Sequence, residues 1–173
     1  GPSIYYPEGQ AIETYSTADK KTTVDIYTWA GAPGDWTLEK ICFNGIGEMY
    51  ALVQMTGSAA PYFCKFDVER KLVFAENLAE YIQELKAADK VANSDGTLGG
   101  EETKVGVNYA VGLEVGTDNR AYIRNGEGIL IFGGDGSFQG EVSFGSMKDV
   151  RVLDFTGDAY RNLYVLYENR ADQ

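Results

Sequence analysis

The chain contains no histidine among its 173 residues. This absence excludes Ser-His-Asp and Cys-His catalytic triads and every metal site that needs an imidazole ligand. The sequence also lacks a Cys-x-x-Cys pair, a phosphate-binding loop, a Gly-x-Gly-x-x-Gly segment that opens a helix and a Ser-x-Asp-x-Gly-x-Thr-Trp aspartate box. We therefore expect no catalytic residue, no cofactor and no metal, and the sequence indicates a protein that is not an enzyme.

Cysteine and proline are scarce, with two and four residues respectively. Cys42 and Cys64 fall in what we predict to be the first and third strands of one sheet. Strands lie about 4.8 Å apart, so the two Cα atoms would be roughly 10 Å apart, which is too far for a disulfide bond. We expect two small buried thiols. Few prolines beside 21 Gly and 12 Tyr are typical of many short strands joined by tight turns.

Basic side chains are too few to balance the acidic ones, because 15 Lys and Arg stand against 26 Asp and Glu, giving a net charge of -11. A surface of this charge repels phosphate backbones, so nucleic-acid binding is not expected, and anionic membrane surfaces are disfavoured in the same way. No apolar run approaches the roughly 20 residues that cross a bilayer, which argues against membrane insertion. The start, Gly1-Pro2-Ser3, resembles the remnant of a removed tag.

Four short apolar segments between residues 111 and 144 are separated by Asp, Asn and Gly residues. Such separators are typical of turns between antiparallel strands. The predicted strands are 112–115, 121–123, 128–132 and 138–144. Together they have the size of a four-stranded antiparallel meander, which is one blade of a β-propeller.

The same pattern recurs on both sides of this segment. A second full meander is predicted before it, with strands at residues 40–43, 48–55, 62–67 and 71–74. Two strands follow it, at residues 150–155 and 162–167. Near the start, residues 11–15 and 23–27 look like the outer two strands of another blade, with residues 4–6 before them.

Three segments share one layout, which indicates a repeat. Residues 43–50, 115–122 and 155–164 each place an apolar residue before a Gly-containing polar turn and a Tyr after it. The turn needs residues that tolerate a positive φ, and the Tyr would pack in the next strand.

The stretch Phe132-Gly133-Gly134-Asp135-Gly136-Ser137-Phe138 extends this layout. With it, residues 115–138 resemble the repeats of NHL-type and related six- or seven-bladed propellers. Those repeats read as an apolar strand, an Asp/Asn/Gly turn, a small residue plus Tyr, and a strand leading into Phe-x-x-Asp-Gly. The resemblance implies a β-propeller fold, from which this chain departs by its small number of blades and by one long insertion.

That insertion is predicted at residues 75–104, as a helix followed by a loop. Leu78, Tyr81, Ile82 and Leu85 recur at helical spacing within residues 76–91, which predicts an amphipathic helix. Polar and Gly residues after it predict a loop. The helix would either cover exposed core or a sheet edge, or dock a partner.

We therefore expect a single all-β domain over residues 1–173, built from repeated four-stranded antiparallel meanders as a partial β-propeller. It would hold about two full and two partial blades, whereas closed propellers have roughly four to eight. The chain would then be a fragment of a larger propeller, or complete its sheets with another chain. The terminal strands could also pair with each other, and open edges would allow self-association. A sandwich or a barrel is the alternative architecture.

Aromatic side chains are the best candidates for a ligand site. Trp29 and Trp36 flank Gly31-Ala32-Pro33-Gly34 between the first two blades, and Tyr109 precedes the third. Such residues could stack on a sugar or grip a peptide, or they could fill the gap between blades.

The sequence thus predicts a non-catalytic binding or scaffolding module that recognises carbohydrate, peptide or protein. We expect it to be extracellular or at a bacterial cell surface. The alternative is part of a propeller hydrolase or lactonase that uses acidic residues and a divalent metal.

Overall fold

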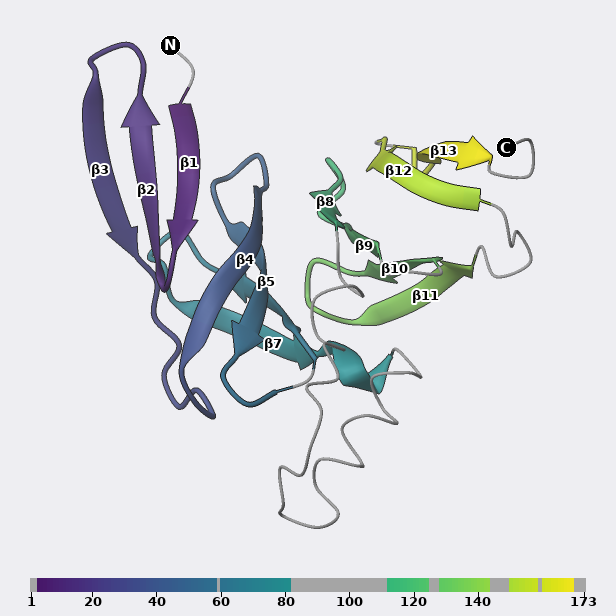
Figure 1. The fold of residues 1–173 in the computed structure, drawn as a ribbon, viewed down its shortest axis with the longest axis horizontal. Helices are drawn as coiled ribbons and strands as arrows, with labels where there is room; N and C mark the ends of the chain where they lie inside the picture. The colour runs from purple at the N-terminus through teal and green to yellow at the C-terminus, as the bar shows by residue number, and fades with distance from the viewer. Residues whose placement is uncertain are drawn as a thin grey trace.

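The computed structural model describes residues 3–58, 60–81, 112–124, 128–143, 150–158 and 160–169. In these ranges the strands form four antiparallel sheets, and each sheet follows the order of its strands in the sequence (Figure 1). The prediction of an all-β chain of antiparallel meanders is confirmed for the described residues.

The first sheet contains β1 (Ser3–Glu8), β2 (Ala11–Ser16) and β3 (Lys21–Ile26). The second sheet contains β4 (Trp36–Phe43), β5 (Met49–Met55), β6 (Tyr62–Phe66) and β7 (Leu72–Asn77). The third sheet contains β8 (Gly112–Val115), β9 (Ala121–Arg124), β10 (Gly128–Phe132) and β11 (Phe138–Ser143). The fourth sheet contains β12 (Val150–Gly157) and β13 (Leu163–Asn169), which pair only with each other among the described strands.

The prediction of a helix that begins at residue 76 is wrong for residues 76–81, which are the ones that the structure describes. Glu76 and Asn77 belong to β7, and only Leu78–Glu80 turn, as a short 3-10 helix capped by the Asn77 side chain on the backbone N–H of Ala79. The apolar spacing arises because Leu78 is buried in the core and Tyr81 packs on Phe132 and Phe138. Residues 82–91 of that helix and the predicted loop lie outside the described residues.

Five hairpins in the described part of the chain share one turn. In each, the carbonyl oxygen of the first turn residue accepts a hydrogen bond from the N–H of the fourth, and its own N–H donates to the carbonyl oxygen of the fifth. In the turn that begins at Asn44, these partners are Gly47 and Glu48. The fourth residue has a positive φ, which is 88° at Gly47 and 87° at Gly136. The turns begin at Asn44, Asp67, Gly116, Gly133 and Asp158. This is a type I turn with a residue in the left-handed region, a common connection of antiparallel strands.

Bulges also recur at equivalent places. In β4, Leu38 pairs with Val53 and Lys40 with Leu52, so Glu39 is an extra residue five positions before the turn at Asn44. In β12 the extra residue is Leu153, again five positions before the turn at Asp158. Val73 in β7 and Gln139 in β11 are likewise extra residues, each six positions after the first residue of its turn. The repeat therefore extends from the sequence to the strand register.

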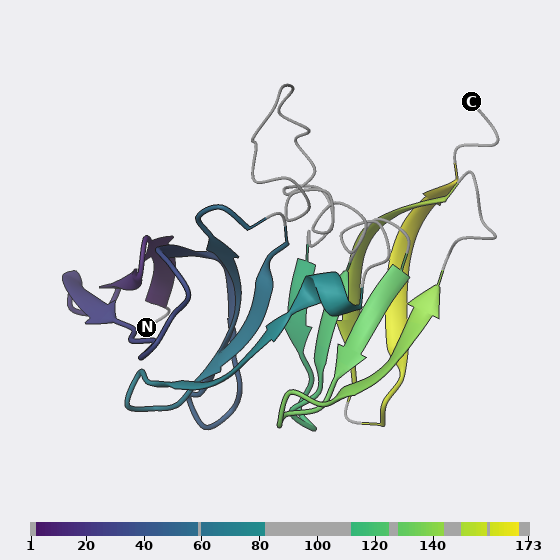
Figure 2. The ribbon, with the colours of Figure 1, turned by 90° about the horizontal axis from the view of Figure 1, so that it is seen from below.

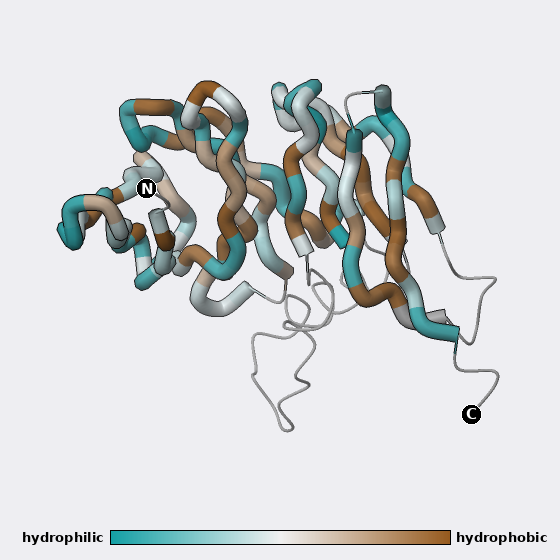
Figure 3. Tube along the Cα trace, turned by 90° about the horizontal axis from the view of Figure 1, so that it is seen from above, coloured by the Kyte–Doolittle hydropathy of each residue, from teal (hydrophilic) through white to brown (hydrophobic). Residues whose placement is uncertain are grey.

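The sheets follow one another face to face (Figures 2 and 3). Clusters of buried apolar side chains lie between them. Tyr50, Leu52 and Phe63 of the second sheet meet Ile123 and Phe132 of the third. A smaller cluster joins the third sheet to the fourth. Burial on this scale supplies most of the favourable free energy of folding.

Strand β5 shows why the centre of the second sheet is so apolar. Met49, Ala51 and Val53 point into the cluster shared with the first sheet, whereas Tyr50 and Leu52 point into the cluster shared with the third. Since successive side chains of a strand face opposite ways, a strand buried on both faces must be apolar at nearly every position.

An ion pair within the second sheet is hydrogen-bonded to a turn of the third sheet. Lys65 Nζ lies 2.7 Å from Glu48 Oε2, and the two side chains are 12% and 20% exposed. The same Lys65 amine donates to the carbonyl oxygen of Gly134 at 3.3 Å, and Asn44 donates to Glu48 Oε2 at 2.8 Å. The hydrogen bond from Lys65, with a further one from Asn44, holds the pKa of Glu48 below its ordinary value of 4.5.

We expect Glu48→Gln to lower the free energy of unfolding by about 1 kcal/mol near pH 7. A carboxylate with a lowered folded-state pKa stabilises the fold above its ordinary pKa, and this contribution is lost as the pH falls through the lowered value. The difference between wild type and variant should therefore shrink below about pH 4.5. Urea unfolding followed by tryptophan fluorescence, near neutral pH and in acid, measures it.

The matched control is Glu69→Gln, which removes the partner of Lys71 from a pair of the same length, 2.7 Å, with side chains 65% and 68% exposed. Exposed pairs contribute little, so this change should stay within about 0.5 kcal/mol. Equal losses in the two variants would contradict the role given to Glu48.

Candidate functional site

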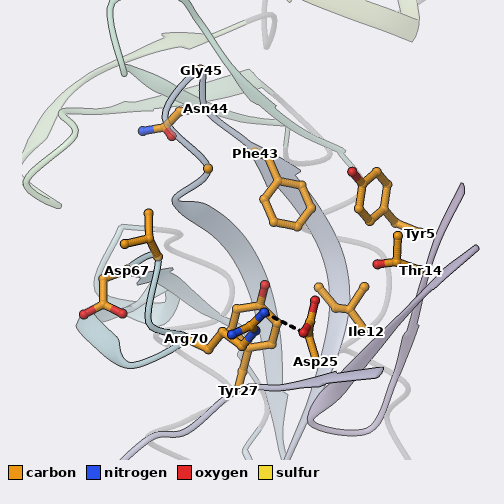
Figure 4. Close-up of a pocket in the computed structure, with 12 residues that line it drawn as sticks. Tyr5, Ile12, Thr14, Asp25, Tyr27, Phe43, Asn44, Gly45, Asp67 and Arg70 are labelled. Atoms are coloured by element: carbon orange, nitrogen blue, oxygen red, sulfur yellow. Dashed lines mark ion pairs between the residues drawn. The ribbon is translucent and has the colours of Figure 1, made fainter. Parts of the chain in front are cut away.

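A cleft of about 420 Å³ opens between the first and second sheets (Figure 4). One wall consists of residues from the first sheet and the segment just after it, namely Tyr5, Ile12, Thr14, Asp25 and Tyr27. The other wall consists of the end of β4 and the turns that follow β4 and β6, including Phe43, Asn44, Gly45, Gly47, Asp67, Val68 and Arg70.

The alternation of β1 and β2 decides which residues reach the cleft. Tyr5 pairs with Thr14, and Pro7 pairs with Ile12, so these side chains share one face of the first sheet. Ile4 and Tyr6 lie on the opposite face. The two-residue period of a strand thus places the neighbouring Tyr5 and Tyr6 in different surroundings.

Two aromatic rings form the upper part of the cleft. Tyr5 and Phe43 have ring centroids 5.2 Å apart with an interplanar angle of 42°. Tyr5 is 48% exposed, so a ligand can reach its ring. The pair joins the first sheet to the second and presents an apolar surface to the cleft, as Figure 4 shows.

An ion pair lies at the opposite end of the cleft. Asp25 Oδ1 lies 2.6 Å from Arg70 Nη2, and the side chains are 34% and 44% exposed. The backbone fixes Arg70, because its carbonyl oxygen accepts a hydrogen bond from the N–H of Thr28 at 2.9 Å. The two charges offer hydrogen-bond donors and acceptors to a ligand while their sum is neutral.

Tyr27 lies beside this ion pair and is 6% exposed. Burial raises the pKa of its hydroxyl, and the negative charge of Asp25 raises it further. The phenol therefore remains protonated at neutral pH. Its ring meets Phe66 edge-on at 5.3 Å, which ties the lower end of the cleft to the core.

The turn residues of the cleft are held by hydrogen bonds of their own. Asn44 Oδ1 accepts from the backbone N–H groups of Ile46 and Glu48 at 3.2 and 2.9 Å. Asp67 Oδ1 accepts from the N–H groups of Glu69 and Lys71, both at 2.9 Å. These side chains set the shape of the wall. Within the described ranges, no group of three or more Cys, Asp or Glu side chains could hold a metal ion.

The two predicted tryptophans come together, but outside the cleft. Trp36 begins β4, is 5% exposed and stacks on Phe66 at 5.8 Å. Trp29 is half-buried, and its ring centroid lies 6.2 Å from that of Trp36 and 5.6 Å from that of Tyr62. Both rings belong to the cluster between the first and second sheets, which is the gap-filling arrangement that the sequence left open. Tyr109 lies outside the described residues.

Sequence reasoning missed the cleft residues Tyr5, Asp25, Phe43 and Arg70. They come from separate parts of the chain and meet only because the first sheet folds against the turns of the second. The one usable signal was that apolar residues occupy successive positions of β1, so both faces of this short, exposed strand are apolar.

The thiols of Cys42 and Cys64 are free, on β4 and β6, with β5 between them.

Among the described residues, no helix has the length and apolar character needed to cross a membrane. No family model matches the chain, and no curated protein matches it significantly.

Proposed function

We propose that the chain is a non-catalytic binding module that holds a neutral, hydroxyl-rich ligand, such as a sugar unit of a carbohydrate, in the cleft between the first and second sheets. The observation that carries the proposal is the Tyr5–Phe43 aromatic surface next to the Asp25–Arg70 ion pair. Aromatic rings pack on the C–H faces of a sugar ring, and a neutral pair of charges exchanges hydrogen bonds with its hydroxyl groups.

The charge of the site favours a neutral ligand. The chain carries a net charge of -11, which repels anions. Arg70 is the cationic residue of the cleft and is paired with Asp25, and Asp67 adds a second carboxylate to the wall, so the lining does not attract anions. A carbohydrate ligand also agrees with a module that acts outside the cell or at its surface, which is the location we propose.

We also propose that the sheets are successive blades of a β-propeller of the NHL-like kind. The repeated turns and bulges support this. The first strand of each sheet also supports it. Strand β4 of the second sheet contacts β8 of the third, and β8 contacts β12 of the fourth, as the inner strands of neighbouring blades do around a propeller axis. In propellers, ligands commonly meet the loops that connect such strands, and the cleft has two turns in its wall.

Titration with neutral oligosaccharides of the cello-, malto- and xylo- series, followed by calorimetry, tests the proposed function. We expect binding that changes little with salt, because a neutral ligand has no net charge to screen. Tyr5→Ala should weaken it about tenfold, which corresponds to roughly 1.4 kcal/mol.

The matched control is Tyr6→Ala. Tyr6 is the next residue, is 56% exposed and lies on the other face of β1, so its loss should leave binding unchanged. Binding that is insensitive to Tyr5→Ala would refute the cleft as the site. Binding of peptides with no response to any oligosaccharide would refute the ligand class.

A further inference from the structure

Strand β3 has one edge with which no other strand of the described chain pairs. It is the outer strand of the first sheet, and Figure 1 shows it at the outer side of that sheet. Five of its six residues are exposed, and the sixth, Asp25, is half-buried. An unpaired edge of this kind presents a row of backbone N–H and C=O groups to which another strand can bind.

The hydrogen bonds beside β3 show which of its residues face this open edge. The N–H of Tyr27 donates to the carbonyl oxygen of Gln10 at 2.9 Å, so the backbone groups of Tyr27 point toward β2. Backbone groups of successive strand residues point to opposite sides, so Thr22, Val24 and Ile26 direct theirs away from β2. These three residues supply the donors and acceptors of the open edge.

The second sheet limits this edge at one end. Thr28 is the next residue that faces the same way, and its backbone groups are already bound. Its N–H donates to the carbonyl oxygen of Arg70, and its carbonyl oxygen accepts from the N–H of Leu72, both at 2.9 Å. A strand added to β3 can therefore extend as far as Ile26 and no further.

The charges of β3 distinguish it from the outer strands of the other sheets. Lys21 and Asp25 are four positions apart, so both side chains lie on the face that lines the cleft. Lys21 is exposed and belongs to none of the ion pairs among the described residues. The outer strands β7, β11 and β13 carry only acidic charges, at Glu76, Glu141 and Glu168. Of these four strands, β3 alone can pair with a copy of itself and bring opposite charges together.

We propose that β3 pairs antiparallel with β3 of a second copy of the chain, about a two-fold axis at Thr23, so that the two first sheets become one continuous sheet. In this register Thr22 exchanges backbone hydrogen bonds with Val24 of the partner subunit, which uses groups of the open edge on both sides. Lys21 lies opposite Asp25 of the partner subunit in a pair without backbone hydrogen bonds, where side chains approach most closely. The two-fold axis makes this ion pair occur twice.

The two neighbouring two-fold registers bring unfavourable contacts. An axis one residue later would place Lys20 of the partner subunit opposite Thr28, to which the second sheet is already bound. An axis one residue earlier would place Asp25 opposite Asp19 of the partner subunit, and like charges directly opposite each other are destabilising. The second sheet and the charges therefore select the same register.

The contact uses the same strand of both subunits, so it is isologous and closes at two copies. It consists of backbone hydrogen bonds and two ion pairs along one short strand, which is a small interface. Each copy also carries a net charge of -11, which opposes association. We therefore expect a reversible dimer that forms as the protein concentration rises.

Sedimentation equilibrium of the whole chain over a range of concentrations tests the proposal. Wild type should follow a monomer–dimer equilibrium with no larger species. Lys21→Asp and Asp25→Lys should each raise the dissociation constant at least about tenfold, because each puts two pairs of like charges across the axis. An equimolar mixture of these two variants should form a 1:1 dimer, because opposite charges then face each other again. The readout is mass alone, so it does not depend on the ligand of the cleft.

Lys20→Asp is the control for Lys21→Asp, since it makes the same change of charge one residue away. Lys20 has a φ of 55° and precedes β3, and it faces no carboxylate in the proposed register. This variant should dimerise as wild type does. Val24→Pro tests the backbone without changing the charge. It removes an N–H that points away from β2, where an edge strand tolerates proline, and should leave a folded monomer.

Monomeric wild type at high concentration would overturn the proposal. Dimers of Val24→Pro as tight as those of wild type would also overturn it, because the contact would then not use the edge of β3. Equal losses in Lys20→Asp and Lys21→Asp would overturn the register, and so would folded charge variants whose mixture stays monomeric. Circular dichroism checks that each variant is folded. Should Asp25→Lys fail to fold, the other three variants still decide.

Discussion

Phe63→Ala is expected to lower the free energy of unfolding by about 3 to 5 kcal/mol, as large-to-small changes of buried aromatic residues do. Phe63 lies in β6, is fully buried and joins the second sheet to the third. Its ring lies 5.0 Å from that of Phe132 and 5.3 Å from that of Phe74. The substitution would leave a cavity within the apolar cluster that joins the two sheets.

Urea unfolding followed by tryptophan fluorescence measures this loss, because Trp29 and Trp36 pack in the second sheet's other cluster. Phe138→Ala removes the same atoms from a ring that is 43% exposed, and should cost only about 1 kcal/mol. Comparable losses from the two substitutions would mean that the space between the second and third sheets is not the core.

The second large effect is expected from Gly136→Val, which should lower the free energy of unfolding by about 2 to 4 kcal/mol. Gly136 has a φ of 87°, a region that a β-branched residue rarely adopts. A Cβ atom there would lie 3.0 Å from two ring carbons of Phe74. Backbone strain and crowding therefore act together at one turn residue.

Arg161→Gly is the converse change in the equivalent turn position. Arg161 holds a φ of 70° and is exposed, so glycine would relieve its backbone strain. We expect a gain of about 1 kcal/mol, measured by thermal unfolding under the same conditions. A loss at Arg161, or no loss at Gly136, would show that the fourth turn residue does not decide the stability of these hairpins.

The strands were predictable because their limits depend on local chemistry. The four strands of the third sheet, predicted at 112–115, 121–123, 128–132 and 138–144, were found within one residue of those limits. Turn residues such as Asn119 and Gly136 accept the left-handed region whatever the rest of the chain does, so the sequence reveals where each strand must stop.

The short helical turn after β7 shows the limit of local periodicity. Leu78 and Tyr81 are three residues apart, which suits one turn as well as several. The extent of strand β7 depends on pairing with β6, where Asn77 pairs with Tyr62. That pairing is a tertiary contact, and the spacing of apolar residues does not contain it.

The cleft was beyond prediction for a related reason. Asp25 and Arg70 are separated in the sequence by three strands of the second sheet, β4 to β6, and their ion pair depends on how the first sheet meets the turn after β6. The tryptophans were recognised as neighbours across a short connection, but burial decides whether such rings pack or bind, and burial follows from the assembled sheets.

The face-to-face order of the sheets has a consequence for how the molecule comes apart. Along the described chain, β5 is buried at nearly every position, whereas all six residues of β1 and most of β13 are exposed. A linear stack in which each layer touches only its neighbours loses its outermost layers first, since each of them has a single interface to break among the described residues. Loosening would thus proceed inward from both ends and reach the second and third sheets last.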